Sequence, residues 1–177
     1  MVVEDEPDLR ELYDAYLEDS YQVISAAGGS EALDLLNDDV DVILLDRRMP
    51  EMSGDEIIDE INEHGNHRIA MVTAVTPQTD IIDMPFDEYL VKPVSQKELL
   101  STVERLLNLD RYDETMQEFM SLVKKRALLL DELKEEELSK NAEFQRLTDD
   151  IAQLESELET LRHRIDPDQE LAFFENL

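Results

Sequence analysis

Cysteine is absent from the 177-residue chain, which excludes disulfides, zinc–cysteine sites, iron–sulfur clusters and thiol catalysis. No apolar run approaches the roughly 20 residues that a membrane-spanning helix needs, and no basic start precedes an apolar stretch as in a signal peptide. We therefore expect a soluble, cytoplasmic protein with no membrane partner. The apolar fraction of 42% is enough for a packed core, so wholesale disorder is not expected.

Basic residues are scarce. The chain has 16 Lys and Arg, of which six are lysine, against 45 Asp and Glu, for a formal net charge of −29. Such a surface repels phosphates, so broad electrostatic binding of DNA is disfavoured. The acidity is dispersed: residues 1–110 carry 27 acidic and 7 basic residues, and residues 111–177 carry 18 and 9. Dispersed acidity indicates adaptation to a high-salt cytoplasm, with an ordinary acidic protein as the alternative.

Glycine and proline are missing from most of the second half. No glycine follows Gly65 and no proline lies between Pro93 and Pro167, so nothing interrupts a long helical stretch. The first 110 residues instead alternate apolar runs with amphipathic segments, the pattern of an α/β domain with a parallel sheet. We predict an α/β domain over 1–110, an all-α helical hairpin or coiled coil over 111–166 and a C-terminal tail over 167–177.

Within the first domain, five apolar runs are the predicted strands, at residues 1–3, 21–26, 40–46, 68–73 and 88–91. Because the chain begins almost inside the first run, we expect a shortened central strand. Ser30 is the predicted cap of a short helix that ends at Leu36. Capping boxes at residues 53–56 and 95–98 open two further helices, of which Gly65 closes the first and the second ends near residue 108. Pro77 and Pro85 fall between the last two strands, so the helix there should be stunted.

In the second half, apolar residues three and four apart predict a coiled-coil seam at Phe144, Leu147, Ile151, Leu154, Leu158, Leu161 and Ile165. A looser stripe precedes it, at Tyr112, Met116, Phe119, Val123, Ala127, Leu130 and Leu133. Leu122 and Leu129 lie off this stripe, which favours a second buried face that packs against a second chain or against the first domain. Asn141 is a good helix cap, so residues 139–141 are the predicted turn. One uninterrupted helix is the alternative.

Polar residues end several predicted strands. Glu4 and Asp5 follow the first strand, Asp46 ends the third, Thr73 ends the fourth and Lys92 follows the fifth. Ligands of an open parallel sheet lie at the carboxyl ends of its strands, so we expect these residues to gather. Clustered carboxylates repel one another unless a cation lies among them, and hard oxygen ligands suit Mg²⁺. The neighbouring lysine would neutralise a phosphoryl group and the neighbouring hydroxyl would hydrogen-bond to it, so the sequence predicts phosphorylation of a carboxylate.

Five motifs also carry a resemblance to a known family. They are VEDEP at 3–7, LLDRRMP at 44–50, SG at 53–54, VTA at 72–74 and YLVKP at 89–93. With these motifs in this order, residues 1–110 resemble a response-regulator receiver domain of two-component signalling. The resemblance implies a doubly wound, flavodoxin-like fold whose five-stranded parallel sheet is sandwiched by helices. It also implies a protein that is not a stand-alone enzyme.

The same resemblance assigns the phosphoacceptor and its metal ligands. Asp46 would accept a phosphoryl group from a sensor histidine kinase. Asp5, Asp46 and the backbone carbonyl of Arg48 would ligate Mg²⁺ or Mn²⁺, and Glu4 would help through water. Each residue alone has an ordinary explanation, such as a strand-end cap or an acidic helix start, but the five motifs together favour the site.

The resemblance further assigns the switch. Thr73 and Tyr89 would be the switch pair, and Lys92 would contact the phosphoryl oxygens ahead of a cis peptide to Pro93. Taken singly, Thr73 would be a β-former and Tyr89 a core residue. The pair at 47–48 would either dock an anionic partner or be solvated loop charge, and the second is favoured.

Residues 111–177 resemble the HalX domain that follows receivers in haloarchaea. The basic cluster at 124–126 is either a DNA contact or a solvated helix face, and the second is favoured. Residues 171–174 would dock on the hairpin or on a partner, or form a frayed tail. We expect a module that relays the signal to a downstream protein, with a homodimer through these helices. A transcription factor whose second domain binds DNA is the alternative.

Overall fold

The computed structural model describes residues 1–166, apart from the side chain of Glu135. It divides into two compact units, Met1–Leu107 and a second one that begins at Asn108. We call them the α/β unit and the helical unit. The predicted tail at 167–177, with its apolar residues 171–174, lies outside the described residues.

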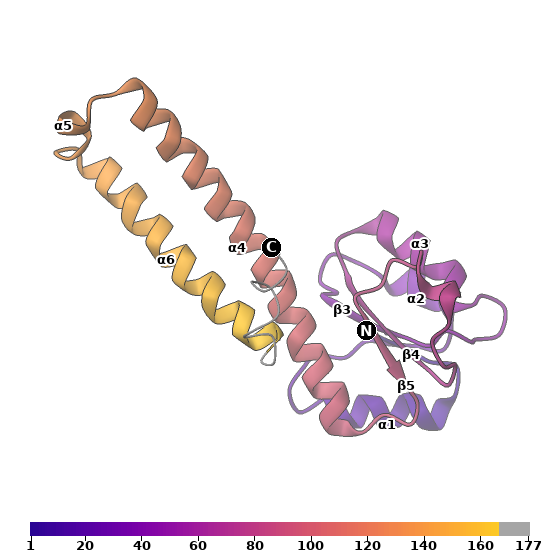
Figure 1. Ribbon diagram of the computed structural model, residues 1–177. Helices are drawn as coiled ribbons and strands as arrows, with labels where there is room; N and C mark the ends of the chain where they lie inside the picture. The colour runs from indigo at the N-terminus through magenta and orange to yellow at the C-terminus, as the bar shows by residue number, and fades with distance from the viewer. Residues whose placement is uncertain (167–177) are drawn as a thin grey trace. The chain divides into compact units, whose positions relative to one another are not determined.

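The α/β unit is built on one parallel sheet with strand order β2-β1-β3-β4-β5 (Figure 1). Its strands are β1 Val2–Val3, β2 Ser25–Ala26, β3 Val42–Leu45, β4 Arg68–Thr73 and β5 Glu88–Val91. Its helices are α1 Pro7–Leu17, α2 Gly29–Leu35, α3 Gly54–His64, the 3-10 turn η1 Thr79–Ile81 and the first turns of α4 Gln96–Glu132. The predicted doubly wound α/β fold with a five-stranded parallel sheet is confirmed.

Alternation along the strands sends apolar side chains to two cores. On one face, Ile43 and Leu45 pack in a core that includes Ile57 and Ile61 of α3. On the other face, Leu44 packs in a core that includes α1 and α4 residues. Because both faces are covered, the central strand β3 is apolar and buried at all of its positions, as buried parallel strands usually are.

Local signals fixed the ends of several elements. Both predicted capping boxes are confirmed: the Ser53 N–H donates to Glu56 at 2.9 Å, and the Ser95 N–H donates to Glu98 at 2.9 Å. The stunted fourth helix is also confirmed, since only η1 lies between Pro77 and Pro85. The predicted cap at Ser30 is wrong, because α2 already begins at Gly29. The predicted second strand is shortened to its last two residues.

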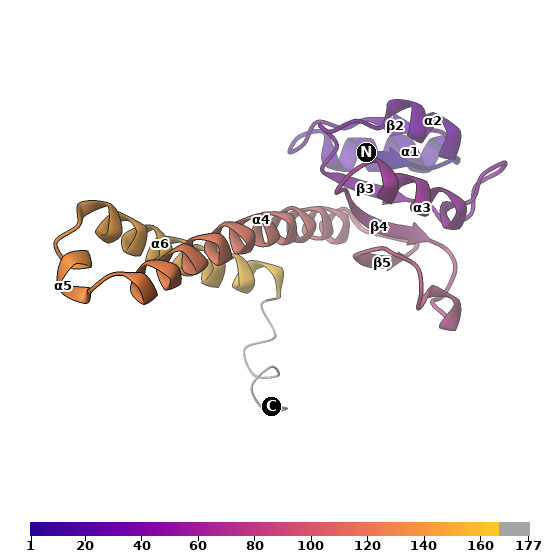
Figure 2. The ribbon, with the colours of Figure 1, turned by 90° about the horizontal axis from the view of Figure 1, so that it is seen from above.

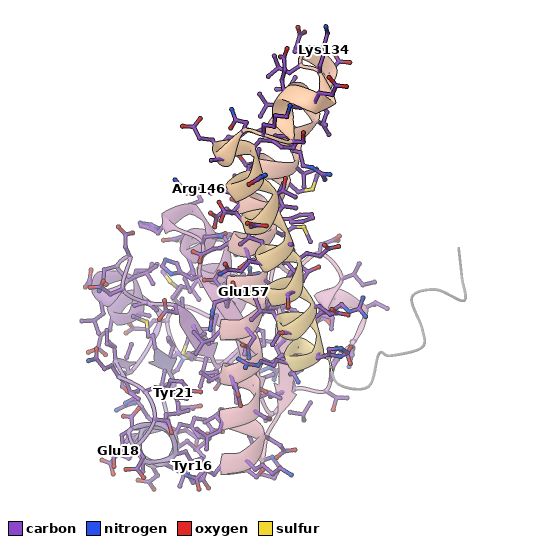
Figure 3. The ribbon with its side chains drawn as sticks, turned by 90° about the vertical axis from the view of Figure 1, so that its left-hand side faces the viewer. Tyr16, Glu18, Tyr21, Lys134, Arg146 and Glu157 are labelled. Atoms are coloured by element: carbon purple, nitrogen blue, oxygen red, sulfur yellow. The ribbon has the colours of Figure 1, made fainter. Side chains whose placement is uncertain are left out.

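The helical unit is a hairpin of α4 and α6, which lie side by side (Figures 1 and 2). The predicted end of a helix near residue 108 is wrong, because α4 is 37 residues long and continues to Glu132. Neither glycine nor proline is present to stop it. The connection is longer than predicted and holds the short α5 Glu135–Leu138, with Lys134 at the far end of the hairpin (Figure 3). Helix α6 spans Ala142–Ile165, and the predicted cap Asn141 accepts from the Glu143 and Phe144 N–H groups at 2.8 and 3.0 Å.

The predicted seam of α6 is buried or half-buried at all seven positions. The predicted stripe of α4 is only partly correct. Leu130 and Leu133 are 46% and 44% exposed, whereas Leu122 and Leu129, which were placed off the stripe, are half-buried. In an unbroken helix, Leu122 and Leu129 are seven residues apart and therefore share one face. Among residues 1–166, no helix is long and apolar enough to cross a membrane.

Candidate functional site

Three carboxylates gather at the carboxyl ends of β1 and β3. These strands are parallel neighbours in which Val3 pairs with Leu45, so Glu4 and Asp46, which follow, leave the sheet side by side. The Asp46 N–H donates to the Val3 carbonyl at 2.9 Å and extends the ladder to the site. One oxygen each of Glu4, Asp5 and Asp46 lies within 4.8 Å of the others. The sheet therefore brings together carboxylates that are distant in sequence.

Lys92 reaches the same cluster from the end of β5. Its N–H donates to the Thr73 carbonyl at 2.8 Å, which fixes its backbone beside β4. Its Nζ lies 2.7 Å from Oε2 of Glu4 and 3.0 Å from Oδ2 of Asp46. The peptide bond to Pro93 is cis. Only 12% of the Lys92 side chain and 2% of the Glu4 side chain are exposed, so water screens this ion pair weakly.

Burial and charge oppose each other in this cluster. Burial raises the pKa of Glu4, and the hydrogen bond and charge of Lys92 offset only part of that rise. Burial lowers the pKa of Lys92, but the hydrogen bonds to Glu4 and Asp46 and the charges of these two carboxylates together outweigh burial and hold that pKa above its usual value. Three carboxylates against one lysine leave a net negative charge when ionised, which is the setting that a divalent cation prefers.

Thr73 and Tyr89 bind the same residue. Thr73 ends β4 and is 1% exposed, and its hydroxyl oxygen accepts from the Val75 N–H at 3.3 Å. The Tyr89 hydroxyl donates to the Val75 carbonyl at 2.8 Å. The Tyr89 ring also packs against Phe86, with 5.6 Å between ring centroids. Val75 thus links the two residues through its backbone, a role that no side-chain pattern in the sequence could reveal.

The adjacent arginines after Asp46 differ. Arg48 is exposed, and its N–H donates to Oδ1 of Asp46 at 3.4 Å. For Arg47 the predicted solvated loop charge is wrong: it is 8% exposed and pairs with Asp55 at 2.8 Å and with Asp80 at 2.5 Å. These hydrogen bonds raise the pKa of Arg47 above its usual value. Asp80 is 33 residues away in sequence, so only the fold brings the pair together.

Gly54 allows α3 to begin against the acidic loop. Its N–H donates to the Arg47 carbonyl at 2.9 Å. A β-carbon at this position would lie 2.5 Å from the Asp46 carbonyl oxygen and 2.9 Å from the Arg47 Cα. Glycine is therefore needed for this close approach. The SG motif signalled a helix cap at Ser53, but the packing requirement depends on tertiary structure.

The family model described as response regulator receiver domain matches residues 1–104, which is more than half of the chain. The chain belongs to the response regulator receiver family. The family model described as HalX domain matches residues 108–173, so the receiver is followed by a HalX domain, as the sequence resemblance implied. We refer to the α/β unit as the receiver from here on.

Among curated relatives, a Haloferax volcanii protein whose name assigns it to the transcriptional regulators is 46% identical over 143 residues, which cover 77% of this chain and 25% of that protein. Response regulator SaeR of Staphylococcus aureus is 33% identical over 112 residues, which cover 60% of this chain and 49% of SaeR. The chain thus spans a quarter to a half of the relatives that it matches.

Solved structures agree with the fold of the receiver. A CheY-like receiver domain from Methanospirillum hungatei is 30% identical with a TM-score of 0.52, and the match covers 58% of this chain and 87% of that one. A chain from the complex of histidine kinase ThkA with response regulator TrrA is 35% identical with a TM-score of 0.53, and the match covers 60% and 95%.

Proposed function

We propose that Asp46 accepts a phosphoryl group from a histidine kinase and that the HalX domain relays the resulting change by protein contact. One observation carries the first half of the proposal. Asp46 is 6% exposed, shares a cluster of carboxylate oxygens with Glu4 and Asp5, and lies 3.0 Å from Nζ of Lys92. The Asp46 carboxylate, positioned beside the ammonium group of Lys92, is suited to accept a phosphoryl group by in-line transfer.

The transfer step follows from these side chains. A carboxylate oxygen of Asp46 forms the new bond to phosphorus as the bond between phosphorus and the donor's imidazole nitrogen breaks, and the imidazole leaves. Lys92 stabilises the charge on the phosphoryl oxygens. The Thr73 hydroxyl accepts from the Val75 N–H, so its own proton is available to a phosphoryl oxygen. Tyr89 senses the change through Val75. The chain then acts as a phosphoacceptor that assists its own transfer and hydrolysis rather than as a stand-alone enzyme.

The carboxylate cluster fits a hard divalent cation. Oxygens within 4.8 Å of one another are close to the separation of ligands around one ion, since Mg²⁺ lies about 2.0–2.1 Å from each oxygen. Asp5, Asp46 and the Arg48 carbonyl would hold Mg²⁺ or Mn²⁺ directly, and Glu4 through water. When bound, the cation would neutralise charge that develops on the phosphoryl oxygens.

The proposed partners are a sensor histidine kinase and a downstream protein. The structure of ThkA with TrrA supports the first, because its matched chain is 35% identical to this one. Exposed apolar side chains on α4, at Met120 and Leu128, support protein contact by the HalX domain and a homodimer through its helices. DNA binding is the alternative, which the name of the Haloferax relative favours. Against it, residues 111–177 hold 18 acidic and 9 basic residues.

The phosphoacceptor is tested with a small phosphodonor and Mg²⁺. Intact mass spectrometry of the full chain should show one added phosphoryl group, and Asp46→Asn should abolish it. Asp39→Asn is the matched control, because Asp39 is an exposed aspartate before the same strand. Equal phosphorylation of the Asp46→Asn chain would contradict the assignment.

The output is tested on the full chain in high salt. Light scattering should give more than a monomer, and Leu128→Asp should reduce association without loss of helicity, because Leu128 is 67% exposed. A monomer that shifts duplex DNA with sequence preference would instead support the DNA-binding alternative.

A further inference from the structure

Arg47 is a buried cation that the phosphoryl-transfer site does not use. It directly follows Asp46, yet only 9% of its side chain is exposed. Its partners come from two other elements: Asp55 lies in the first turn of α3, and Asp80 lies in η1. The three residues, which we call the Arg47 triad, therefore connect the acceptor loop, α3 and η1.

Arg47 binds the two aspartates of the triad with different numbers of hydrogen bonds, and we call each of these two ion pairs an arm of the triad. Asp55 is held by a bidentate pair, with Nε to Oδ1 at 2.8 Å and Nη2 to Oδ2 at 3.0 Å. Asp80 is held by a single bond, from the same Nη2 to Oδ2 at 2.5 Å. The third nitrogen, Nη1, is buried and makes no hydrogen bond among the described residues. Bidentate pairs are the stronger and more directional of the two kinds, so the Asp80 arm is the weaker one.

The segment that the weaker arm holds has little else to fix it. Residues 76–80 and 82–83 are exposed, and Ile82 is 75% exposed. Apolar contact with the receiver core begins again only at Met84 and Phe86. A segment with so few buried contacts is drawn from the low end of local stability, so one ion pair weighs heavily in its position.

We propose that the Arg47 triad is a latch that holds η1 against α3 in the unphosphorylated receiver, and that phosphorylation of Asp46 opens its Asp80 arm. This inference rests on the proposed phosphoacceptor role of Asp46. Phosphorylation turns a carboxylate with one negative charge into an acyl phosphate with about two, so it adds about one negative charge one residue from Arg47. Nη1 of Arg47 is a buried donor that has no hydrogen-bond partner among residues 1–166. The new charge competes for the guanidinium, and the single bond to Asp80 is lost before the bidentate pair to Asp55. The segment around η1 is then released.

Amide hydrogen exchange on the full chain tests the resting latch. Asp80→Asn should speed exchange of residues 76–83, because it weakens the arm with little change in shape. Asp83→Asn is the matched control, an exposed aspartate in the same segment. In the wild-type chain, beryllofluoride with Mg²⁺, which imitates a phosphoryl group on Asp46, should speed the same amides. Unchanged exchange in Asp80→Asn would overturn the latch.

Binding of beryllofluoride tests the coupling. If the ion pair of Arg47 with Asp80 is present only in the unphosphorylated state, it disfavours the state that binds beryllofluoride. Asp80→Asn should therefore tighten beryllofluoride binding by about two- to fivefold, the size expected for a partly exposed ion pair. Asp83→Asn should bind as the wild type does. If the wild type binds no beryllofluoride, the phosphoacceptor role fails as well. If it binds normally and Asp80→Asn binds equally or more weakly, only the latch is wrong.

Discussion

The receiver and the helical unit hold their acidic residues in opposite ways. In the receiver, Glu4 and Asp46 are buried and share Lys92. In the helical unit, acidic residues of α6 such as Asp149 and Glu159 point into solvent. Burial of a carboxylate is costly unless it is paired, whereas an exposed carboxylate on a helix costs little. The difference separates acids that form a site from acids that only keep a surface solvated.

Stability also has different sources in the two units. The receiver buries side chains such as Ile43 and Ile61 completely, between strands and helices far apart in sequence. The helical unit covers one stripe of each helix, and several of its seam residues, such as Leu154, are only half-buried. Truncation of a fully buried side chain leaves a cavity, while a half-buried site loses less contact and lets water in. The following predictions test this contrast.

The largest effect should come from salt, because salt acts on every charge at once. The Debye length falls from about 30 Å at 0.01 M to about 3 Å at 1 M, so repulsion is removed over that range. Residues 1–107 carry 19 net negative charges and residues 108–177 carry ten. Protection from hydrogen exchange should therefore rise more steeply in the receiver than in the helical unit. Amide hydrogen exchange of the full chain, measured at increasing potassium chloride concentrations, reports the stability of each unit separately. A flat profile would remove the argument for adaptation to salt.

The next effect should come from matched apolar truncations. Ile43→Ala should cost the receiver about 2–5 kcal/mol, because Ile43 is fully buried in the sheet. Leu154→Ala should cost the helical unit less than about 2 kcal/mol, because Leu154 is half-buried. Urea-dependent hydrogen exchange assigns each loss to its unit. Equal losses would mean that the two units are packed alike.

A smaller effect should come from pH. The raised pKa of Glu4 means that the folded receiver binds this proton more tightly than the unfolded chain does. Ionisation of Glu4 therefore lowers receiver stability as pH rises from the ordinary carboxyl range through the raised value. Glu4→Gln should flatten the fall in receiver stability that begins in the ordinary carboxyl range, at about pH 4, measured by urea unfolding without divalent ions. A profile unchanged by Glu4→Gln would show that this carboxyl titrates normally.

Loss of the side-chain cap of α6 should lower the stability of the helical unit by a modest amount. Asn141→Ala removes the acceptor for two helical N–H groups and should cost about 1 kcal/mol. Asn141→Ser should restore most of that loss, because serine also caps well. Exchange of the first turn of α6 is the measurement. No recovery with serine would point to packing rather than capping.

The smallest effect should come from the ion pair of Arg111 with Glu157 in the helical unit. Its atoms lie 3.2 Å apart, but the side chains are 58% and 38% exposed. Arg111→Gln should therefore cost less than about 0.5 kcal/mol. Arg146→Gln is the control, because Arg146 is an exposed arginine on α6; it is labelled together with Glu157 in Figure 3. A loss as large as that of Asn141→Ala would mean that this pair is far better shielded than its exposure indicates.

The sequence patterns predicted the features that depend on neighbouring residues, such as helix caps and the ends of strands. Capping boxes such as Ser53 with Glu56 and the cap at Asn141 are short-range, and strand ends marked the carboxylates because parallel strands share one edge. The long α4 was missed because its first half fitted one unit and its second half another, although nothing in between could stop a helix. The burial of Arg47 was missed because its partner Asp80 arrives through the fold.

Gly54 has a consequence for which mutations the chain can accept. A β-carbon there would meet backbone atoms of Asp46 and Arg47, and backbone cannot rotate aside as a side chain can. At Gly28 a β-carbon would meet nothing within 4 Å. Of these two glycines in a chain with only four, position 54 is closed to the other amino acids and position 28 is open to them. A library of variants selected for function should therefore keep glycine at position 54 and diversify freely at position 28.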